Sequence, residues 1–331
     1  MTAPIGEQIL SCLKHSADIY GVGVRFSMYG ESFLVIGYFF YTAHWPGDTV
    51  LANLCRNTLF TGFTLLVCAF LQYFMQGLTV HDILVLLNYS WMIHLGGLLP
   101  IFIWSYRVVF RRRPVPPDLA DVDNSRCVWQ SILLLAIHLS ALGTLGVLLW
   151  TRVQAVGDQP GCTLHTALML FGSSYSVFNE TIRRVSLAIY WLAAIPVLNV
   201  LVTSAAAFMP LAVVALLLSM MKRVVHRQLI SWDVFARYGG ITTIFVLLVL
   251  LITHTELMIA QGVHTSLAGK AEEQWTFGQA LALINFLAHV VEMAKALCTQ
   301  SADRARTEEE ERGLGIIGPH QGVPIRLTPR S

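Results

Sequence analysis

Residues 127–150 read CVWQSILLLAIHLSALGTLGVLLW, a run without a single Asp, Glu, Lys or Arg. A helix of about 20 mainly apolar residues is long enough to cross the hydrocarbon core of a bilayer, and it pairs its own backbone polar groups there. Three further stretches, 57–80, 83–106 and 187–221, are equally free of charge. None of them shows the two-residue alternation of a membrane β-barrel strand. The sequence therefore predicts an all-α protein, a polytopic bundle of transmembrane helices.

The composition of the whole chain supports this prediction. Of its 331 residues, 55% are hydrophobic and 13% are charged, whereas an ordinary soluble domain has about 25% charged residues. Seven stretches are apolar enough to be spans, and they hold only four of the charged residues. These spans are predicted, within a transmembrane domain of residues 26–297, at 26–44, 57–76, 83–105, 127–150, 187–221, 238–259 and 275–297. The net charge of +2 and the placement of basic residues beside spans indicate a lipid bilayer as partner and no nucleic acid.

The orientation of the bundle follows from the basic residues in its loops, because cytosolic loops carry an excess of Lys and Arg. With seven spans, one side holds 15 basic residues and the other holds six. The run 187–221 is long for one helix, so a kink at Pro196 or Pro210 or a two-span hairpin are alternatives, but a hairpin would destroy the charge asymmetry. We therefore expect one span there, an external N-terminal segment 1–25 and a cytosolic, disordered tail 298–331.

Loop 106–126, on the predicted cytosolic side, is strongly basic. It contains three successive arginines at 111–113, followed by a proline-rich stretch. A basic segment next to a membrane helix attracts anionic lipid. Contact with anionic lipid is therefore the first interpretation of this loop, and docking of a cytosolic partner is the alternative.

Loop 151–186, on the predicted external side, carries the sequon Asn179-Glu180-Thr181, so Asn179 is a glycosylation candidate. Cys12 and Cys162 are also predicted to be external, and a disulfide between them is left open. The first 25 residues contain no apolar core followed by a cleavage site, so the first span is expected to act as the targeting signal.

Short stretches near both ends of the chain share a pattern with one group of proteins. Residues 18–25 read DIYGVGVR with Tyr29 following, residues 256–259 read ELMI, and residues 275–279 read WTFGQ. In these segments the chain resembles a large group of functionally uncharacterised multi-span membrane proteins from filamentous and mushroom-forming fungi. The resemblance implies a shared architecture and a fungal source, and it implies no particular activity or cofactor.

Polar side chains inside spans are costly in lipid and therefore point to functional positions. Three distant segments are expected to bring an outer polar cluster together: Arg25, His254, Glu256 and Gln279 near the outer boundary, with Glu31 about 9 Å deeper. We expect Arg25 to pair with Glu256, with Gln279 hydrogen-bonded nearby; snorkelling of both charges to headgroups is the alternative. A deeper set of polar residues comprises Ser90, His94, His138, Asn285, His289 and Glu292.

Clustering of His94, His138 and His289 would indicate a zinc site, because neutral imidazoles bind zinc. Seven-span ceramidase-like hydrolases have an H-x-x-x-H pattern in the last span, whereas residues 289–293 read HVVEM here. Hydrogen bonding between helices is therefore the expected role of these residues, and neither a metal nor a cofactor is predicted.

The sequence leaves several classes of function open. A receptor- or sensor-like protein is favoured by seven spans and basic cytosolic loops, although the D-R-Y and N-P-x-x-Y motifs of common receptors are missing. A small-solute or lipid transporter is the first alternative, and a membrane-embedded metal-dependent hydrolase is the second; a purely structural role is also left open. An enzyme is not favoured, and the expected location is the plasma membrane or an endomembrane.

The predicted topology is tested with reporters at both ends of the chain. A reporter after Ser331 is expected in the cytosol and one before Met1 outside, because of the asymmetry in basic residues. Reporters on the same side would mean an even number of spans and would contradict the single span at 187–221. A glycan at Asn179, detected by a mobility shift after endoglycosidase treatment, would independently place loop 151–186 outside.

Overall fold

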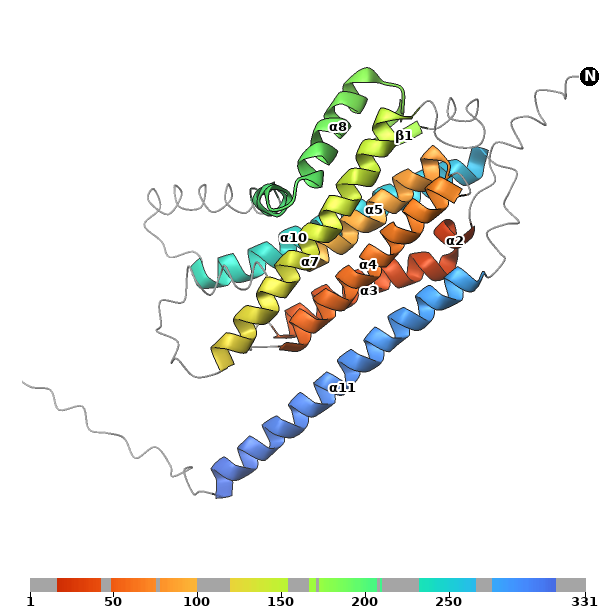
Figure 1. The fold of residues 1–331 in the computed structure, drawn as a ribbon. Helices are drawn as coiled ribbons and strands as arrows, with labels where there is room; N and C mark the ends of the chain where they lie inside the picture. The colour runs from red at the N-terminus through yellow and green to blue at the C-terminus, as the bar shows by residue number, and fades with distance from the viewer. Residues whose placement is uncertain are drawn as a thin grey trace, which may run out of the picture. The chain divides into compact units, whose positions relative to one another are not determined.

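The structure is a computed structural model that describes residues 17–42, 49–75, 78–99, 120–153, 167–170, 173–206, 209, 232–265 and 276–313. Most of these residues are helical (Figure 1). The helices are α2 (Ala17–Tyr20), α3 (Val22–Thr42), α4 (Thr49–Met75), α5 (Val80–Gly97), α7 (Ala120–Thr151), α8 (Glu180–Ala194), α10 (Trp232–Thr265) and α11 (Phe277–Gly313). Strands β1 (Ala167–Leu170) and β2 (Ser173–Ser176) form an antiparallel hairpin in which Ala167 is opposite Ser176.

Helix α5 lies at the centre of the first of two compact units, residues 1–289. All of its residues except Asn88 and Trp91 are buried. A helix that is hydrophobic all round has to be enclosed by other elements, and α3, α4, α7 and α10 pack around α5. The helix begins with a capping box, in which the Thr79 hydroxyl accepts from the Asp82 amide and the Asp82 carboxylate accepts from the Thr79 amide.

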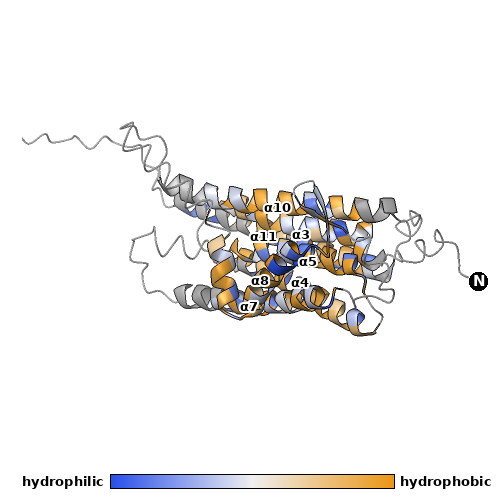
Figure 2. Cartoon of the chain, turned by 90° about the horizontal axis from the view of Figure 1, so that it is seen from above, coloured by the Kyte–Doolittle hydropathy of each residue, from blue (hydrophilic) through white to orange (hydrophobic). Residues whose placement is uncertain are grey.

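Four helical segments are long and apolar enough to cross a membrane, and they correspond to the second, fourth, sixth and seventh predicted spans. They are Asn53–Met75, Trp129–Thr151, Gly239–Ala260 and Gly278–Thr299. Large apolar side chains such as Phe60, Leu133 and Leu250 are exposed on these helices, and hydrophobic residues run along most of α10 (Figure 2). In its described residues the protein is therefore a mainly helical membrane protein with one small hairpin.

The second unit, residues 290–331, is described up to Gly313, where α11 ends. We expected disorder from residue 298, but the chain is helical through this first part of the tail. The stretch 302–312 consists mainly of Ala, Arg and Glu, which are strong helix formers. Their propensity explains why the helix outlasts the apolar segment.

The expected end of loop 106–126 also changes. Helix α7 begins at Ala120, so the end of the predicted loop 106–126 is helical. Acidic residues at 121 and 123 suit the positive end of the helix dipole at this start. The arginines at 111–113 and the two cysteines Cys12 and Cys162 lie outside the described residues.

The run 187–221, which we predicted as one span, contains a helix break at Pro196. Helix α8 ends at Ala194, and Val197 has a φ of 70°, which a β-branched residue rarely adopts. The Asn199 side chain stabilises this turn, since its amide nitrogen lies 3.0 Å from the carbonyl oxygen of Ala193 and 3.1 Å from that of Ala136 on α7. The helix break falls at Pro196, one of the two kink positions that the sequence offered within this span.

Helices α7 and α8 approach each other closely at two glycines. A Cβ atom at Gly143 would lie 2.3 Å from the backbone nitrogen of Ala194, and one at Gly146 would lie 2.2 Å from the Tyr190 ring. Small residues at such crossings let the backbones meet, which is a common way to pack helices in membranes. The α7–α8 contact therefore depends on the absence of side chains at these positions.

The same substitution at two glycines should have opposite effects on stability. Gly143→Ala places a methyl group against backbone that cannot move aside, and overpacking of this kind costs about 1–3 kcal/mol. At Gly37 on α3, an added Cβ meets nothing within 4 Å, so Gly37→Ala should be neutral or stabilising because alanine is the better helix former. Thermal unfolding in detergent measures both, and an equal melting temperature for the two variants would contradict the close crossing.

Candidate functional site

The expected ion pair between the first and sixth predicted spans is present. Arg25 Nη1 on α3 lies 3.1 Å from Glu256 Oε2 on α10. The Tyr29 hydroxyl, one turn further along α3, donates to Glu256 Oε1 at 2.7 Å. The Arg25 and Glu256 side chains are 21% and 42% exposed, so the pair is partly dehydrated and stronger than a fully exposed one.

Gln279 joins the same end of α3, also as expected. Its side-chain oxygen accepts from the backbone amide of Gly23 at 3.4 Å. Four residues along α3, the Ser27 hydroxyl donates to the carbonyl oxygen of Ala282 at 2.9 Å. The start of α11 is thus held against α3 by polar contacts in successive turns.

His254 and Glu31 make contacts other than those we expected in the outer cluster. The side-chain amide of Asn88 on α5 donates to His254 Nδ1 at 3.1 Å, so this histidine links α10 to the central helix. Glu31, two turns beyond Arg25, contacts residues of the deeper polar set instead of Arg25 or Glu256. The residues of the predicted outer cluster are therefore divided: Arg25 pairs with Glu256, whereas His254 and Glu31 each contact other residues.

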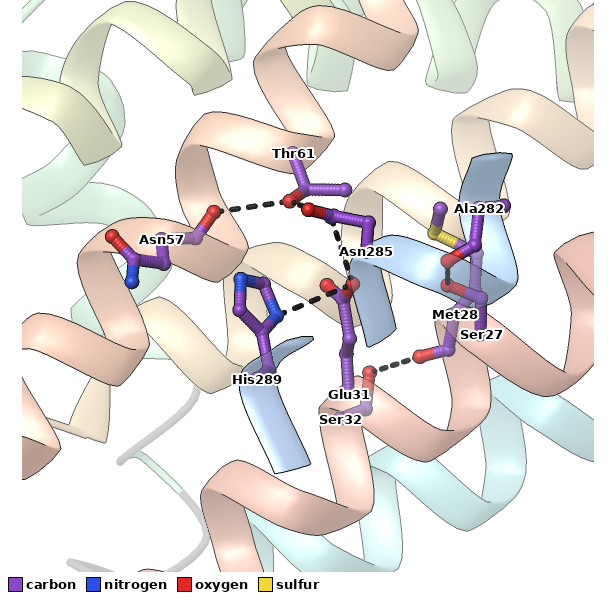
Figure 3. Close-up of polar contacts among 9 residues, drawn as sticks. All are labelled: Ser27, Met28, Glu31, Ser32, Asn57, Thr61, Ala282, Asn285 and His289. Atoms are coloured by element: carbon purple, nitrogen blue, oxygen red, sulfur yellow. Dashed lines mark hydrogen bonds and ion pairs between the residues drawn. The ribbon is translucent and has the colours of Figure 1, made fainter. Parts of the chain in front are cut away.

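The deeper cluster joins polar groups of α3, α4 and α11 (Figure 3). Glu31 Oε1 lies 3.5 Å from His289 Nδ1 and 3.4 Å from the amide nitrogen of Asn285. Asn285 also donates to the Thr61 hydroxyl at 2.9 Å, and that hydroxyl donates to the Asn57 carbonyl at 3.1 Å. The Glu31 side chain has no exposed surface, so a titratable pair is enclosed between apolar helices.

Thr61 was not predicted as a site residue, because a threonine inside a span does not by itself indicate a functional position. A threonine hydroxyl commonly bonds to the carbonyl four residues back in its own helix, as Thr61 does. Glu292, expected on the same face as Asn285 and His289, has an exposed side chain and belongs to the second unit.

Ser90, His94 and His138 are buried at the interface of α5 with α4 and α7. Neither ring nitrogen of His94 or His138 has a hydrogen-bond partner in the part of the chain that the structure describes, and the same holds for the Ser90 hydroxyl. The His94 ring packs edge-on against Trp91, and His138 lies against Gly62.

A zinc site at His94, His138 and His289 finds no support in this arrangement. His289 pairs with Glu31, and within the described ranges no group of three His, Cys, Asp or Glu residues is placed to hold a metal ion. Two histidines without a third ligand fall short of the usual three or four protein ligands of zinc.

A third polar contact, not found from the sequence, links α2, α5 and α10. His81 Nε2 lies 3.0 Å from the carbonyl oxygen of Met258, so it carries a proton. The Tyr20 hydroxyl lies 2.6 Å from His81 Nδ1. Burial, together with the nearby Asp82 carboxylate, raises the pKa of Tyr20 well above its usual value, so the hydroxyl stays protonated.

A cavity of about 610 Å³ lies beside the deeper cluster. Its wall is mainly apolar and is formed by α3, α4, α5 and the start of α11. The lining residues that matter below are Met28, Thr61, Thr64, Cys68, Leu281 and Asn285. The volume falls in the range of about 300–1,000 Å³ that is typical of small-molecule sites, which are mostly apolar with a few polar groups.

Asn179, the glycosylation candidate, is exposed and caps α8. Its side-chain oxygen accepts from the backbone amides of Thr181 and Ile182. A glycan is attached through the side-chain nitrogen, so modification would leave this cap intact.

Comparisons of the chain with protein-family models, curated proteins and solved structures find no match. The function has to be inferred from the geometry of the cavity and its polar neighbours.

The ion pair between α3 and α10 can be tested by exchanging its charges. Arg25→Glu and Glu256→Arg should each lower the free energy of unfolding by about 1–3 kcal/mol, between the values for exposed and buried pairs. The double variant should recover much of this loss, because the opposite charges meet again. Thermal unfolding in detergent measures all three, with Arg184→Glu, in an exposed pair on α8, as the control. Losses that simply add in the double variant would show that the two side chains do not interact.

Proposed function

We propose that the protein is a receptor- or sensor-like membrane protein that binds a small amphipathic ligand in the cavity beside Asn285 and Thr61. The observation that carries this proposal is the combination of a 610 Å³ apolar cavity with a polar wall at Asn285 and Thr61. An apolar chain fits the Met28 and Leu281 side, and a polar head fits the Asn285 side.

The proposal includes the topology that the sequence predicts: seven spans, with the N-terminus outside and the C-terminus in the cytosol. The basic loop 106–126 would then face the cytosolic leaflet and contact anionic lipid. The resemblance to multi-span fungal proteins adds support for the architecture and none for a particular ligand.

A lipid or small-solute transporter is the second candidate, and the Glu31–His289 pair favours it. Buried carboxylate and histidine side chains inside membrane helices are typical of proton relays in pumps and transporters. Glu31 and His289 lie 3.5 Å apart and next to the cavity wall. If Glu31 and His289 exchanged a proton while the ligand passed, ligand movement would be coupled to proton movement.

Occupancy of the cavity is tested through Cys68, which lines it and is an exposed free thiol. Dodecanol is expected to slow the alkylation of Cys68 by N-ethylmaleimide, because an occupied cavity blocks the thiol. Cys298, also exposed, lies outside the lining residues and serves as the internal control in peptide mass spectrometry. Thr64→Trp should fill the cavity and abolish the effect of dodecanol.

Val67→Trp is the matched control, because Val67 is exposed on the same helix and does not line the cavity. Dodecanol should still slow Cys68 alkylation in this variant. Equal rates with and without dodecanol in the unaltered protein would overturn the proposed site. Proton movement into liposomes that depends on both ligand and Glu31 would favour transport over the receptor-like function.

A further inference from the structure

Glu31 is a buried carboxylate that forms no ion pair with a lysine or arginine in the described part of the chain. Its two described contacts, at 3.5 Å to His289 and 3.4 Å to Asn285, are long, and Glu31 Oε2 accepts no hydrogen bond from the described residues. A carboxylate can accept about four hydrogen bonds. Its bonding capacity is therefore only partly used by the protein.

The nearest cation along α3 is already engaged elsewhere. Arg25 is bound to Glu256 at 3.1 Å, and six residues along a helix separate it from Glu31 by a rise of about 9 Å. Within the described ranges, no lysine or arginine forms an ion pair with Glu31. Among the described residues, Glu31 and Glu256 are two carboxylates, and Arg25 supplies one guanidinium. One negative charge is left without a cation when both carboxylates are ionised and His289 is uncharged.

The negative charge lies behind the polar wall of the cavity. Both amide protons of Asn285 are used, one toward Glu31 and one toward Thr61. The Thr61 hydroxyl proton is used as well, in the bond to Asn57. The Asn285 side-chain oxygen accepts no hydrogen bond among the described residues, so at Asn285 and Thr61 the cavity wall offers an acceptor and their donors are already used.

We infer that the cavity selects amphipathic amines, with the protonated amine at Asn285 and the apolar chain along Met28 and Leu281. An ammonium group donates three hydrogen bonds and supplies the positive charge that Glu31 lacks. An alcohol donates one hydrogen bond without a charge, and a carboxylate head meets like charge. This inference rests on the proposed function, since it names the ligand class of the same cavity.

A proton on His289 competes with the amine for the same role. The imidazole Nδ1 lies 3.5 Å from Glu31 Oε1, so a charged His289 would neutralise the carboxylate. The amine is therefore bound best by the form of the protein in which His289 is uncharged.

The test compares three probes with the same chain length: dodecylamine, dodecanol and laurate. Protection of Cys68 against N-ethylmaleimide gives the half-maximal concentration of each, with Cys298 as the internal control. Dodecylamine is expected to protect at a roughly tenfold lower concentration than dodecanol, and laurate at a higher one. This ranking is measured on the unaltered protein, so it does not depend on whether a variant folds.

Glu31→Gln should remove the advantage of dodecylamine over dodecanol, measured as the ratio of their half-maximal concentrations in the same variant. Glu180→Gln, at an exposed carboxylate on α8, is the matched control and should keep the advantage. An amine that is no better than the alcohol in the unaltered protein, or an advantage that persists in Glu31→Gln, would overturn the inference and leave the proposed cavity standing. Failure of all three probes to protect Cys68 would instead overturn the proposed function.

Discussion

The burial of the Glu31 carboxylate is the constraint on which the arrangement of α3, α4 and α11 depends. An ion taken out of water costs several kcal/mol unless neighbouring groups replace its hydration. Asn285 and His289 from α11 supply those neighbours, and Thr61 from α4 holds Asn285 in place. Because each of these side chains needs the others, a shift of α11 along α3 would leave a charge and several hydrogen-bonding groups unpaired. The polar contacts thus set the register in which otherwise apolar helices meet.

Helices α7 and α8 are held together mainly by close packing at glycines. Their contact relies on close backbone approach at Gly143 and Gly146 and on packing of Tyr190 over the second glycine. Asn199 then fixes the turn after α8 by donating to carbonyl oxygens of both helices. Close packing of small residues and polar bonds between helices both stabilise membrane bundles, where lipid is as apolar as the protein surface. This chain uses polar bonds beside its cavity and small residues on the far side of α5.

The sequence predicted the membrane helices and the Arg25–Glu256 pair, because both depend on strong, local signals: long uncharged runs and rare charges near span ends. It did not predict that Glu31 turns to Asn285 and His289, since facing directions in a bundle depend on how the helices pack. Pro196 marked the break in 187–221, yet the decisive partner was Asn199, whose acceptors lie on α7. The cavity could not be predicted from the sequence, because it depends on how segments far apart in the chain, from Ile19 to Asn285, pack together.

The contrast between the two buried polar regions indicates where a ligand would act. His94 and His138 are fully buried among the helices that pack around α5. Glu31 is equally buried, but its partner Asn285 reaches the wall of a cavity. A ligand that binds Asn285 changes the electrostatic surroundings of Glu31 without touching it, and it does so at the junction of α3, α4 and α11. Under the proposed function, binding energy at this junction would act on the contacts that hold the three helices in register, as a receptor or a transporter requires.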